Sequence, residues 1–312
     1  MNPIQVDIKR IEFVITNSCS GNCKHCSAIT GDAANGSVDA AAAIRAITQL
    51  TSRYSVESIM TFGGEPLLYS DTTCQIHKTA YDCEIPVRQI ITNGFFSHDT
   101  QKIEDVAAAL CASGVNNILL SVDAFHQETI PLEPVITFAK ALLNNGTPKL
   151  RVHPAWVIDE KAENLYNEET RKLLKLFSDI GIDVSDGNNI FPAGNALKYL
   201  SEYFPRPETI DLSLPCGQMP YTGRLDEVEC VSINPKGDLE LCSIVIGNIY
   251  ENDALTILDS YAPYGNPTTR ALLEGGVEKL LEYASDLGVT VDTSDCYSAC
   301  GICRKTMRTL RR

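Results

Sequence analysis

The sequence has few basic residues for its length. Its 312 residues include 26 lysines and arginines against 40 aspartates and glutamates, a net charge of -14 with an isoelectric point near 4.8. A protein that binds the phosphate backbone of nucleic acids needs the opposite balance. The composition therefore argues against nucleic acid as a partner, and the acidic excess mostly reflects a solvated surface.

Long apolar runs are also missing. No run approaches the roughly 20 residues of a membrane-spanning helix, and residues 1–10 lack the apolar core of a secretory signal peptide. We therefore expect a cytoplasmic protein with no membrane partner. In that compartment thiols stay reduced, so cysteines are expected to bind metal and not to form disulfides.

Cysteine is what the sequence does contain, with 12 residues. Three of them lie in Cys19-Ser-Gly-Asn-Cys23-Lys-His-Cys26, directly after the apolar run 11–16, which predicts a buried strand. Soft thiolates at this spacing suit an iron–sulfur cluster or zinc. A structural zinc site is closed by four protein ligands, whereas a cluster on three cysteines keeps one iron open. A zinc loop that borrows His25, or a fourth ligand from elsewhere, is the alternative.

The run Gly63-Gly64-Glu65-Pro66 follows a second predicted strand, 57–62. Glycines let a backbone approach a ligand closely, and a carboxylate accepts hydrogen bonds from an ammonium group. A simple turn is the alternative interpretation. Its position after the three cysteines, again at the end of a predicted strand, favours a ligand-binding role over a simple turn.

These two motifs together resemble those of the radical S-adenosylmethionine (SAM) superfamily. The resemblance implies a [4Fe–4S] cluster on Cys19, Cys23 and Cys26, whose open iron binds the amino and carboxylate groups of SAM. It also implies that the Gly-Gly-Glu-Pro run cradles the SAM amino group. An electron from a flavodoxin- or ferredoxin-like donor would cleave SAM to methionine and a 5′-deoxyadenosyl radical, which removes hydrogen from a substrate.

Short apolar runs alternate with helical patterns from residue 11 to about 204. Strands are predicted at 11–16, 57–62, 87–92, 117–122, 149–157 and 187–191, and helices at 38–53, 100–113, 133–144 and 167–179, with Ser37 and Asp99 as N-caps. Six βα repeats imply parallel strands joined by right-handed crossovers. The predicted fold class is therefore α/β, with the partial (β/α)6 barrel that the resemblance implies.

Polar residues follow the third and fourth predicted strands. They are Asn93, then Ser121, Asp123 and His126. Barrel enzymes place their chemistry at the carboxyl ends of the strands, and the resemblance assigns Asn93, Ser121 and Asp123 to SAM. The alternatives are a turn role for Asn93 and a local Asp123–His126 pair that organises the loop.

Arg151 and His153 alternate with Val152 on the fifth predicted strand and so share one face. If that face lines the barrel, both can touch SAM or substrate; if it points outward, both are surface residues. The turn at 191–196 follows the sixth predicted strand. The resemblance implies that this turn passes close to the adenine of SAM.

We predict two domains, 1–205 and 206–312, joined by a stiff segment that carries three prolines. In the second domain, 229–242 predicts a β-hairpin, with helices at 253–261 and 267–288. A cysteine at the hairpin end followed by Cys-x3-Cys-x2-Cys resembles SPASM and twitch extensions, which carry auxiliary clusters. The resemblance implies one auxiliary [4Fe–4S] cluster on Cys216, Cys242, Cys300 and Cys303. Zinc on the same ligands is the alternative.

Cys230 and Cys296 are left over, and either can replace Cys216. The chain resembles radical SAM peptide epimerases in size, in its Asp–His segment and in its cysteine pattern. Those epimerases place a hydrogen-donating cysteine directly after the hairpin cysteine, where this chain has Ser243. If epimerisation is the reaction, Cys230 or Cys296 is the donor. Both, with His126, are therefore the candidate catalytic residues.

The predicted function is hydrogen abstraction from a peptide or protein, leading to epimerisation or an oxidative cross-link. Residues before 11 leave no room for a leader-peptide recognition domain, so the peptide is expected to bind the barrel mouth directly or with a partner. One alternative is a small-molecule substrate, such as a sugar or amino-acid derivative. Another is a zinc-stabilised binding protein without catalytic activity.

Overall fold

The fold is known from a computed structural model that describes residues 4–27, 36–218 and 223–310. The strands are β1 (Gln5–Val14), β2 (Ser58–Phe62), β3 (Val87–Thr92), β4 (Asn117–Leu120), β5 (Leu150–Val152), β6 (Ala155–Trp156), β7 (Asp183–Val184), β8 (Asn188–Asn189), β9 (Glu227–Ile233), β10 (Asp238–Leu241) and β11 (Ile244–Asn248). The helices are α1 (Ala40–Arg53), α2 (Ser70–Asp82), α3 (Thr100–Ala112), α4 (Ala124–Gln127), α5 (Leu132–Asn144), α6 (Leu165–Asp179), α7 (Asn195–Tyr199), α8 (Ala254–Asp259), α9 (Pro267–Asp286) and α10 (Ala299–Leu310), with short 3-10 turns at Pro66–Tyr69 and Ser201–Tyr203.

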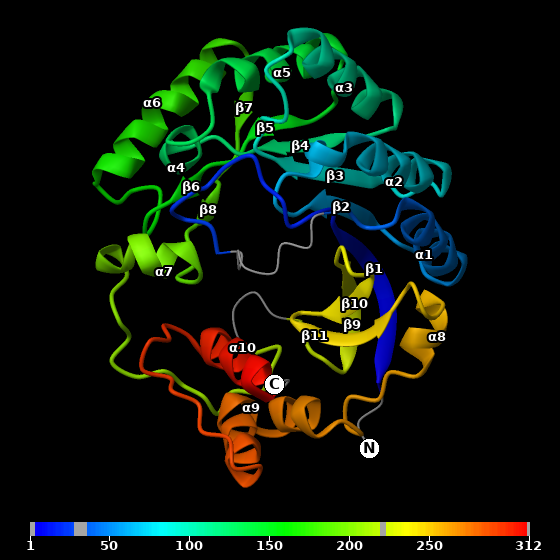
Figure 1. Ribbon diagram of the computed structural model, residues 1–312, viewed down its shortest axis with the longest axis vertical. Helices are drawn as coiled ribbons and strands as arrows, with labels where there is room; N and C mark the ends of the chain where they lie inside the picture. Colours follow the sequence, from blue (N-terminus) through cyan, green and yellow to red (C-terminus); the bar gives the residue numbers. More distant parts are fainter. Residues whose placement is uncertain (1–3, 28–35, 219–222, 311–312) are drawn as a thin grey trace.

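Nine strands form one sheet in the order β11-β10-β9-β1-β2-β3-β4-β5-β7. The six strands from β1 to β7 in this order run parallel, as expected for βα repeats. The sheet curves, with α1, α2, α3, α5 and α6 along its outer side (Figure 1). This is the predicted α/β class with a partial barrel.

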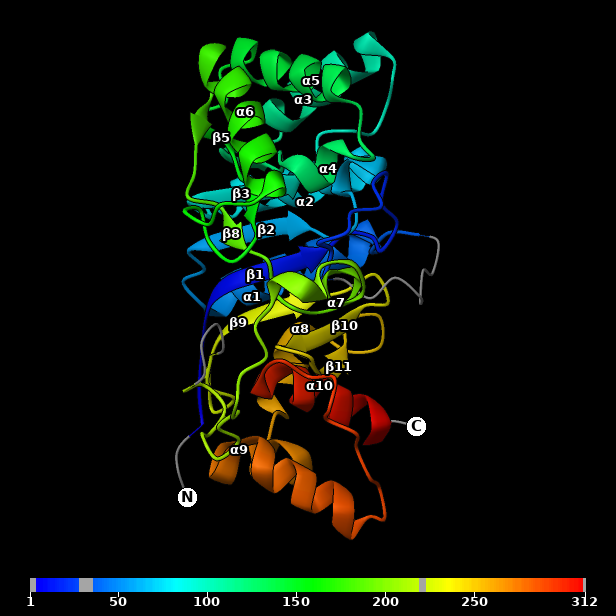
Figure 2. The same ribbon diagram turned by 90° about the vertical axis from the view of Figure 1, so that its left-hand side faces the viewer.

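The C-terminal hairpin continues the barrel sheet. Strand β9 pairs in parallel with β1, and β10 and β11 follow antiparallel. Figure 2 shows α9 and α10 at the end of the molecule far from α5. One apolar core contains residues from both predicted domains, including Ile11, Val231, Leu272 and Ile302. The boundary at residue 205 stays a prediction, but the two parts share a sheet and a core.

Alternation along the strands gives the sheet two chemically different faces. On β1, Ile11 and Phe13 are fully buried with Ile47 of α1. Their neighbours Arg10 and Glu12 therefore point to the opposite, concave face, where they form an ion pair of 2.7 Å. The helices cover the apolar face, and the concave face is left polar.

Some predicted elements differ from the structure. The sixth strand of the barrel is β7 at 183–184, while 188–189 pairs with β6 in a separate two-stranded sheet. Helix α1 is capped by Asp39, whose side chain accepts from Ala42 N, and not by Ser37. Helices α2 and α10 were not predicted. Among the described residues, no helix is both long and apolar enough to cross a membrane.

Candidate active site

The loop after β1 brings Cys19, Cys23 and Cys26 together. Cys26 N donates to Cys23 O at 3.2 Å, which makes a tight turn. Asn195, at the start of α7, clamps this turn: its backbone N–H donates to Cys26 O at 2.9 Å and its side-chain amide to Cys23 O at 3.2 Å. No local pattern marks Asn195 for this role, because the contact joins segments 172 residues apart in the sequence.

The three thiols are close enough to influence one another's ionisation. Burial raises the pKa of Cys23 to about 12, and the negative charges of Asp123, Cys19 and Cys26 add to the shift. Burial also raises the pKa of Cys19. A metal centre supplies the positive charge that such thiolates need. The donor set therefore fits a cluster held by three cysteines.

Gly63 and Gly64 pack against the cysteine loop. A Cβ on Gly63 would lie 2.5 Å from Thr16 O, and one on Gly64 would lie 2.0 Å from Ser18 O. Two backbone hydrogen bonds join the segments, from Gly64 N to Thr16 O and from Glu65 N to Ser18 O. The glycines thus allow close approach of two backbones, and their contact with a ligand stays a prediction.

Glu65 points inward instead of toward an open site. Its side chain is fully buried and accepts hydrogen bonds from the Thr92 hydroxyl at 2.7 Å, Asn93 N at 2.8 Å and Leu67 N at 2.9 Å. Burial raises its pKa to about 7, against the lowering effect of these donors. The carboxylate ties the end of β2 to the end of β3, and Pro66 is buried at the start of the following turn.

Asn93 touches the cysteine loop. Its side-chain amide donates to Ser20 Oγ at 3.1 Å and lies 3.6 Å from Cys19 Sγ. Its Oδ1 accepts from Phe95 N at 2.8 Å, which is the bond of a turn residue. Asn93 therefore serves as a turn residue and also borders the site.

Asp123 and His126 form the local pair. His126 Nδ1 lies 2.8 Å from Asp123 Oδ2, and the carboxylate also accepts from the backbone N–H groups of Phe125, His126 and Ala155. The imidazole of His126 holds the pKa of Asp123 below its usual range, against the opposing effect of burial. The loop-organising alternative for this pair is therefore correct, and contact with SAM stays a prediction for Ser121 and Asp123.

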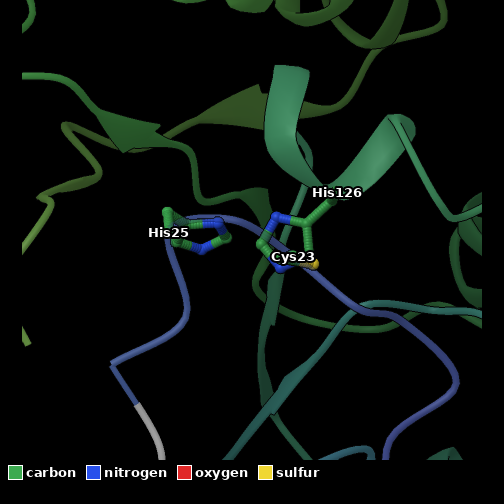
Figure 3. A group of neighbouring side chains, drawn as sticks. All are labelled: Cys23, His25 and His126. Atoms are coloured by element: carbon green, nitrogen blue, oxygen red, sulfur yellow. The ribbon is translucent and has the colours of Figure 1, made fainter. Parts of the chain in front are cut away.

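His25 lies next to this pair. Its ring centroid is 4.7 Å from that of His126 and 5.1 Å from that of Phe125. Burial lowers the pKa of His25 to about 4, and the nearby His126 contributes. Figure 3 shows both imidazoles beside the sulfur of Cys23.

Arg151 and His153 lie on the concave face. Leu150 and Val152, which alternate with them, pack into the core under α5 and α6, so the two polar side chains point the other way. Arg151 donates to Asn117 Oδ1 at 3.0 Å. The nitrogens of His153 lie 2.8 Å from Ser185 Oγ and 2.7 Å from Asn188 Nδ2. Both side chains thus lie on the barrel side of the sheet, and their contact with SAM or substrate stays a prediction.

Cys230 also belongs to the concave face. It lies on β9 opposite Arg10 of β1 and alternates with Val231, which is buried in the core. The thiol is accessible, yet protein surrounds it on a concave surface. That partial burial and the carboxylate of Glu12 raise the pKa of Cys230 to about 12, against the effect of Arg10. The group is therefore a neutral thiol at neutral pH.

Four C-terminal cysteines converge from three elements. Cys216 lies in the linker, Cys242 at the end of β10, and Cys300 and Cys303 on α10. Burial raises the pKa of Cys303 to about 12, with added repulsion from Cys216, Cys242 and Cys300. Burial likewise raises the pKa of Cys216 to about 11, and repulsion from Cys242 and Cys300 adds to the shift. These four are the predicted auxiliary ligands.

Cys296 stands apart from that group. It precedes α10, and its Sγ lies 3.6 Å from Asp295 Oδ1. Burial raises its pKa. The negative charges of Asp295 and Asp292 raise it further, whereas the positive charge of Lys305 lowers it. Its surroundings differ from those of Cys230, which faces the barrel.

A model of the radical SAM superfamily matches residues 13–194. This match covers more than half of the chain and includes the cysteine loop, the Gly-Gly-Glu-Pro run and the polar strand ends. The chain therefore belongs to the radical SAM superfamily. Members of this superfamily are enzymes, and their fold binds a [4Fe–4S] cluster and SAM.

One curated relative matches only in part. A probable GTP 3′,8-cyclase from Methanocaldococcus jannaschii is 29% identical over 122 residues, which are 39% of this chain and 39% of that protein. The matched part thus spans well under two thirds of the length of this relative.

Three solved structures share the fold over most of the chain. SuiB of Streptococcus suis, bound to the precursor peptide SuiA, has 18% identity and a TM-score of 0.58, covering 96% of this chain and 77% of that one. The His-tagged anSMEcpe with bound SAM has 11% identity and a TM-score of 0.54, covering 97% and 95%. BtrN in complex with SAM and 2-DOIA has 16% identity and a TM-score of 0.51, covering 88% and 91%. At these identities the likeness shows the fold alone.

Proposed function

We propose that this chain abstracts hydrogen from a peptide or protein substrate. The observation that carries the proposal is the trio of Cys19, Cys23 and Cys26, gathered at the end of β1 in a radical SAM chain. When bound, the cluster and SAM supply a 5′-deoxyadenosyl radical, and an external one-electron donor starts the reaction. The protein's part is to hold these groups, orient the substrate and exclude water.

The residues around the trio form the proposed SAM site. Gly63, Gly64, Glu65 and Pro66 belong to it, as do Asn93, Ser121, Asp123, Arg151 and His153. Because the Glu65 carboxylate already bonds three donors, we infer that the Gly-Gly-Glu-Pro run acts mainly through its backbone. Asn93 and Ser20 border Cys19 directly, while Arg151 and His153 line the concave face.

A peptide substrate is supported by the polar concave face and by two fold neighbours. That face carries Arg10, Glu12 and Cys230 near one edge and Arg151 and His153 near the other. Guanidinium, carboxylate and imidazole groups of this kind can bind the polar backbone groups of a peptide. SuiB binds the peptide SuiA, and anSMEcpe binds a peptide called Cp18Cys.

A small molecule is the second candidate. BtrN is similar over 91% of its own length, and its complex contains 2-DOIA. Binding measurements distinguish the two candidates. An extended peptide that binds with micromolar affinity and protects the concave face would favour a peptide substrate. Protection only by a small polyol or amino acid favours the second.

The auxiliary cluster is the second part of the proposal. Convergence of Cys216, Cys242, Cys300 and Cys303 supports it, with α10 supplying two of the four ligands. When bound there, such a cluster would supply an acceptor for the electron of the substrate radical. Zinc at this position is the competing assignment.

Two single substitutions test both cluster assignments. Anaerobically reconstituted protein should hold about eight irons per chain, from two four-iron clusters. Cys23→Ala should lower this to about four irons and abolish formation of 5′-deoxyadenosine from SAM. Cys300→Ala should also leave about four irons, keep part of the SAM cleavage and stop substrate turnover. Iron, sulfide and 5′-deoxyadenosine are the quantities to measure.

Cys111→Ala is the matched control, because Cys111 lies on α3 and outside both sets. It should keep both clusters and full SAM cleavage. If Cys23→Ala and Cys300→Ala behave like this control, the cluster assignments are wrong. A colourless chain that takes up zinc but no iron under the same conditions would favour the zinc-stabilised binding protein.

A further inference from the structure

Cys23, His25 and His126 form a compact group of metal-ligating side chains. Their ligand atoms, one from each residue, all lie within 4.8 Å of one another. Figure 3 shows how they meet: Cys23 and His25 come from the cysteine loop, and His126 comes from α4. The sequence marks His25 as a possible zinc ligand but does not pair it with His126, which is about a hundred residues away in the chain.

His126 is held in the orientation of a metal ligand. The Asp123 carboxylate accepts from three backbone N–H groups and is an acceptor only, so the proton on the 2.8 Å bond belongs to His126 Nδ1. That tautomer leaves a lone pair on Nε2. A carboxylate behind a histidine is the usual support of metal-binding imidazoles, because it fixes the ring and increases its basicity.

His25 has an unsatisfied nitrogen in the same place. Its Nδ1 is buried and, among the described residues, has no hydrogen-bond partner. A buried polar atom without a partner destabilises the fold, so such atoms are rare unless a ligand satisfies them. The ring is also fixed in position, because it packs against Phe125 and His126.

We propose that Cys23, His25 and His126 bind one divalent transition-metal ion of the zinc type when the cluster is absent. One thiolate and two imidazoles form a ligand set that zinc and cobalt prefer, and water completes the coordination. Tetrahedral zinc sets its ligands about 3.5 Å apart, so the three groups need only a small adjustment. Cys23 cannot serve both centres, which makes this ion and the [4Fe–4S] cluster mutually exclusive; only this exclusivity rests on the proposed function.

Cobalt titration of the full-length chain, without oxygen, tests the site. The Cys19→Ala/Cys26→Ala chain is the background, because it retains the proposed ligands but not the three-cysteine set. In it we expect a cobalt equivalent with a thiolate-to-cobalt charge-transfer band. Adding His25→Ala or His126→Ala should remove that equivalent or weaken its binding at least tenfold. His98→Ala, an exposed histidine on another loop, should leave it unchanged.

The C-terminal cysteines can take up their own cobalt, which affects all variants equally and cancels in the comparison. If neither His25→Ala nor His126→Ala changes the number or the affinity of cobalt ions, the site does not exist. Failure of the cluster assignment would appear separately, as no loss of iron in Cys23→Ala.

Exclusivity has its own measurement. Zinc bound by the C-terminal cysteines lowers iron uptake equally in the wild type and in the His25→Ala variant, so these two chains are compared. Zinc loading should lower the iron uptake of the wild type by about four irons more than that of His25→Ala. An equal reduction in both chains would overturn the exclusivity.

Discussion

At the scale of single residues, Glu65 of the Gly-Gly-Glu-Pro run has a structural role. It lies between the ends of β2 and β3, fully buried, with three donors around its carboxylate. Burial raises its pKa from 4.5 to about 7. The unfolded chain has the ordinary pKa, so the folded state holds this proton more tightly.

Stability should therefore fall as the pH rises from about 4.5 to about 7 through this group. The loss has an upper limit of roughly 3.5 kcal/mol, since each pKa unit corresponds to about 1.4 kcal/mol. Glu65→Gln does not titrate at this position, so we expect the free energy of unfolding of the wild type to fall relative to that of Glu65→Gln as the pH rises. Urea unfolding of cluster-free protein at several pH values measures this.

Glu104→Gln is the matched control, because Glu104 is exposed on α3. Its unfolding free energy should follow the wild type at every pH. Parallel curves for wild type and Glu65→Gln would show that the Glu65 carboxylate does not carry the predicted shift. Other titrating groups occur in all three proteins and cancel in the comparison.

At the scale of elements, the break in α9 positions Cys216, one of the four proposed auxiliary ligands. The helix is interrupted at Gly275 and Gly276, and Gly276 has a left-handed φ of 66°. The linker passes over this break and is tied there by two hydrogen bonds: Glu278 N donates to Leu212 O, and Cys216 N donates to Leu272 O. A Cβ on Gly276 would lie 2.3 Å from Leu214 O.

Gly276→Ala should therefore displace the linker and Cys216 with it. We expect about four irons per chain in place of about eight, because only the auxiliary cluster is lost. Cleavage of SAM at the cysteine loop should continue. Iron content and 5′-deoxyadenosine formation are the measurements.

Gly288→Ala separates the steric effect from backbone strain. Gly288 also has a left-handed φ, of 76°, but a Cβ there would meet no atom within 4 Å. This control should keep both clusters despite a strain of about 1 kcal/mol. If Gly276→Ala also keeps all its iron, the break in α9 does not position Cys216.

At the scale of the whole molecule, the pairing of β9 with β1 places a cysteine from the C-terminal part of the chain on the inner face of the barrel. It places Cys230 on the concave face beside Arg10, whereas Cys296 lies near the start of α10. The pKa of Cys230 is raised to about 12, so it retains the hydrogen that a donor must give. We propose Cys230, and not Cys296, as hydrogen donor if the reaction is epimerisation.

With a peptide that the wild-type enzyme converts in deuterated water, epimerisation places one deuterium in the product. Cys230→Ala should still form 5′-deoxyadenosine but place no solvent deuterium in the peptide. Cys296→Ala is the control and should act like wild type. Deuterium incorporation by Cys230→Ala would exclude this residue as donor, and a product that has lost two hydrogens would indicate an oxidative reaction.

The sequence alone predicted the elements whose patterns are local. Helices α3, α5 and α6 were found within about two residues, the usual uncertainty of helix ends, because their apolar periodicity and caps such as Asp99 are encoded nearby. Helix α2 was missed because its buried face includes Thr73 and His77, which do not give an apolar stripe. Ser37 and Asp39 are both good caps two positions apart, so local chemistry could not choose between them.

The two cysteine motifs and the glycine run were determined by the sequence itself, because their ligands and turns follow one another along the chain. The tertiary structure decided which distant groups meet. It alone joined β9 to β1, turned Glu65 inward and set His126 beside His25. Each of these depends on packing between segments far apart in the chain, and local residue patterns do not encode such contacts.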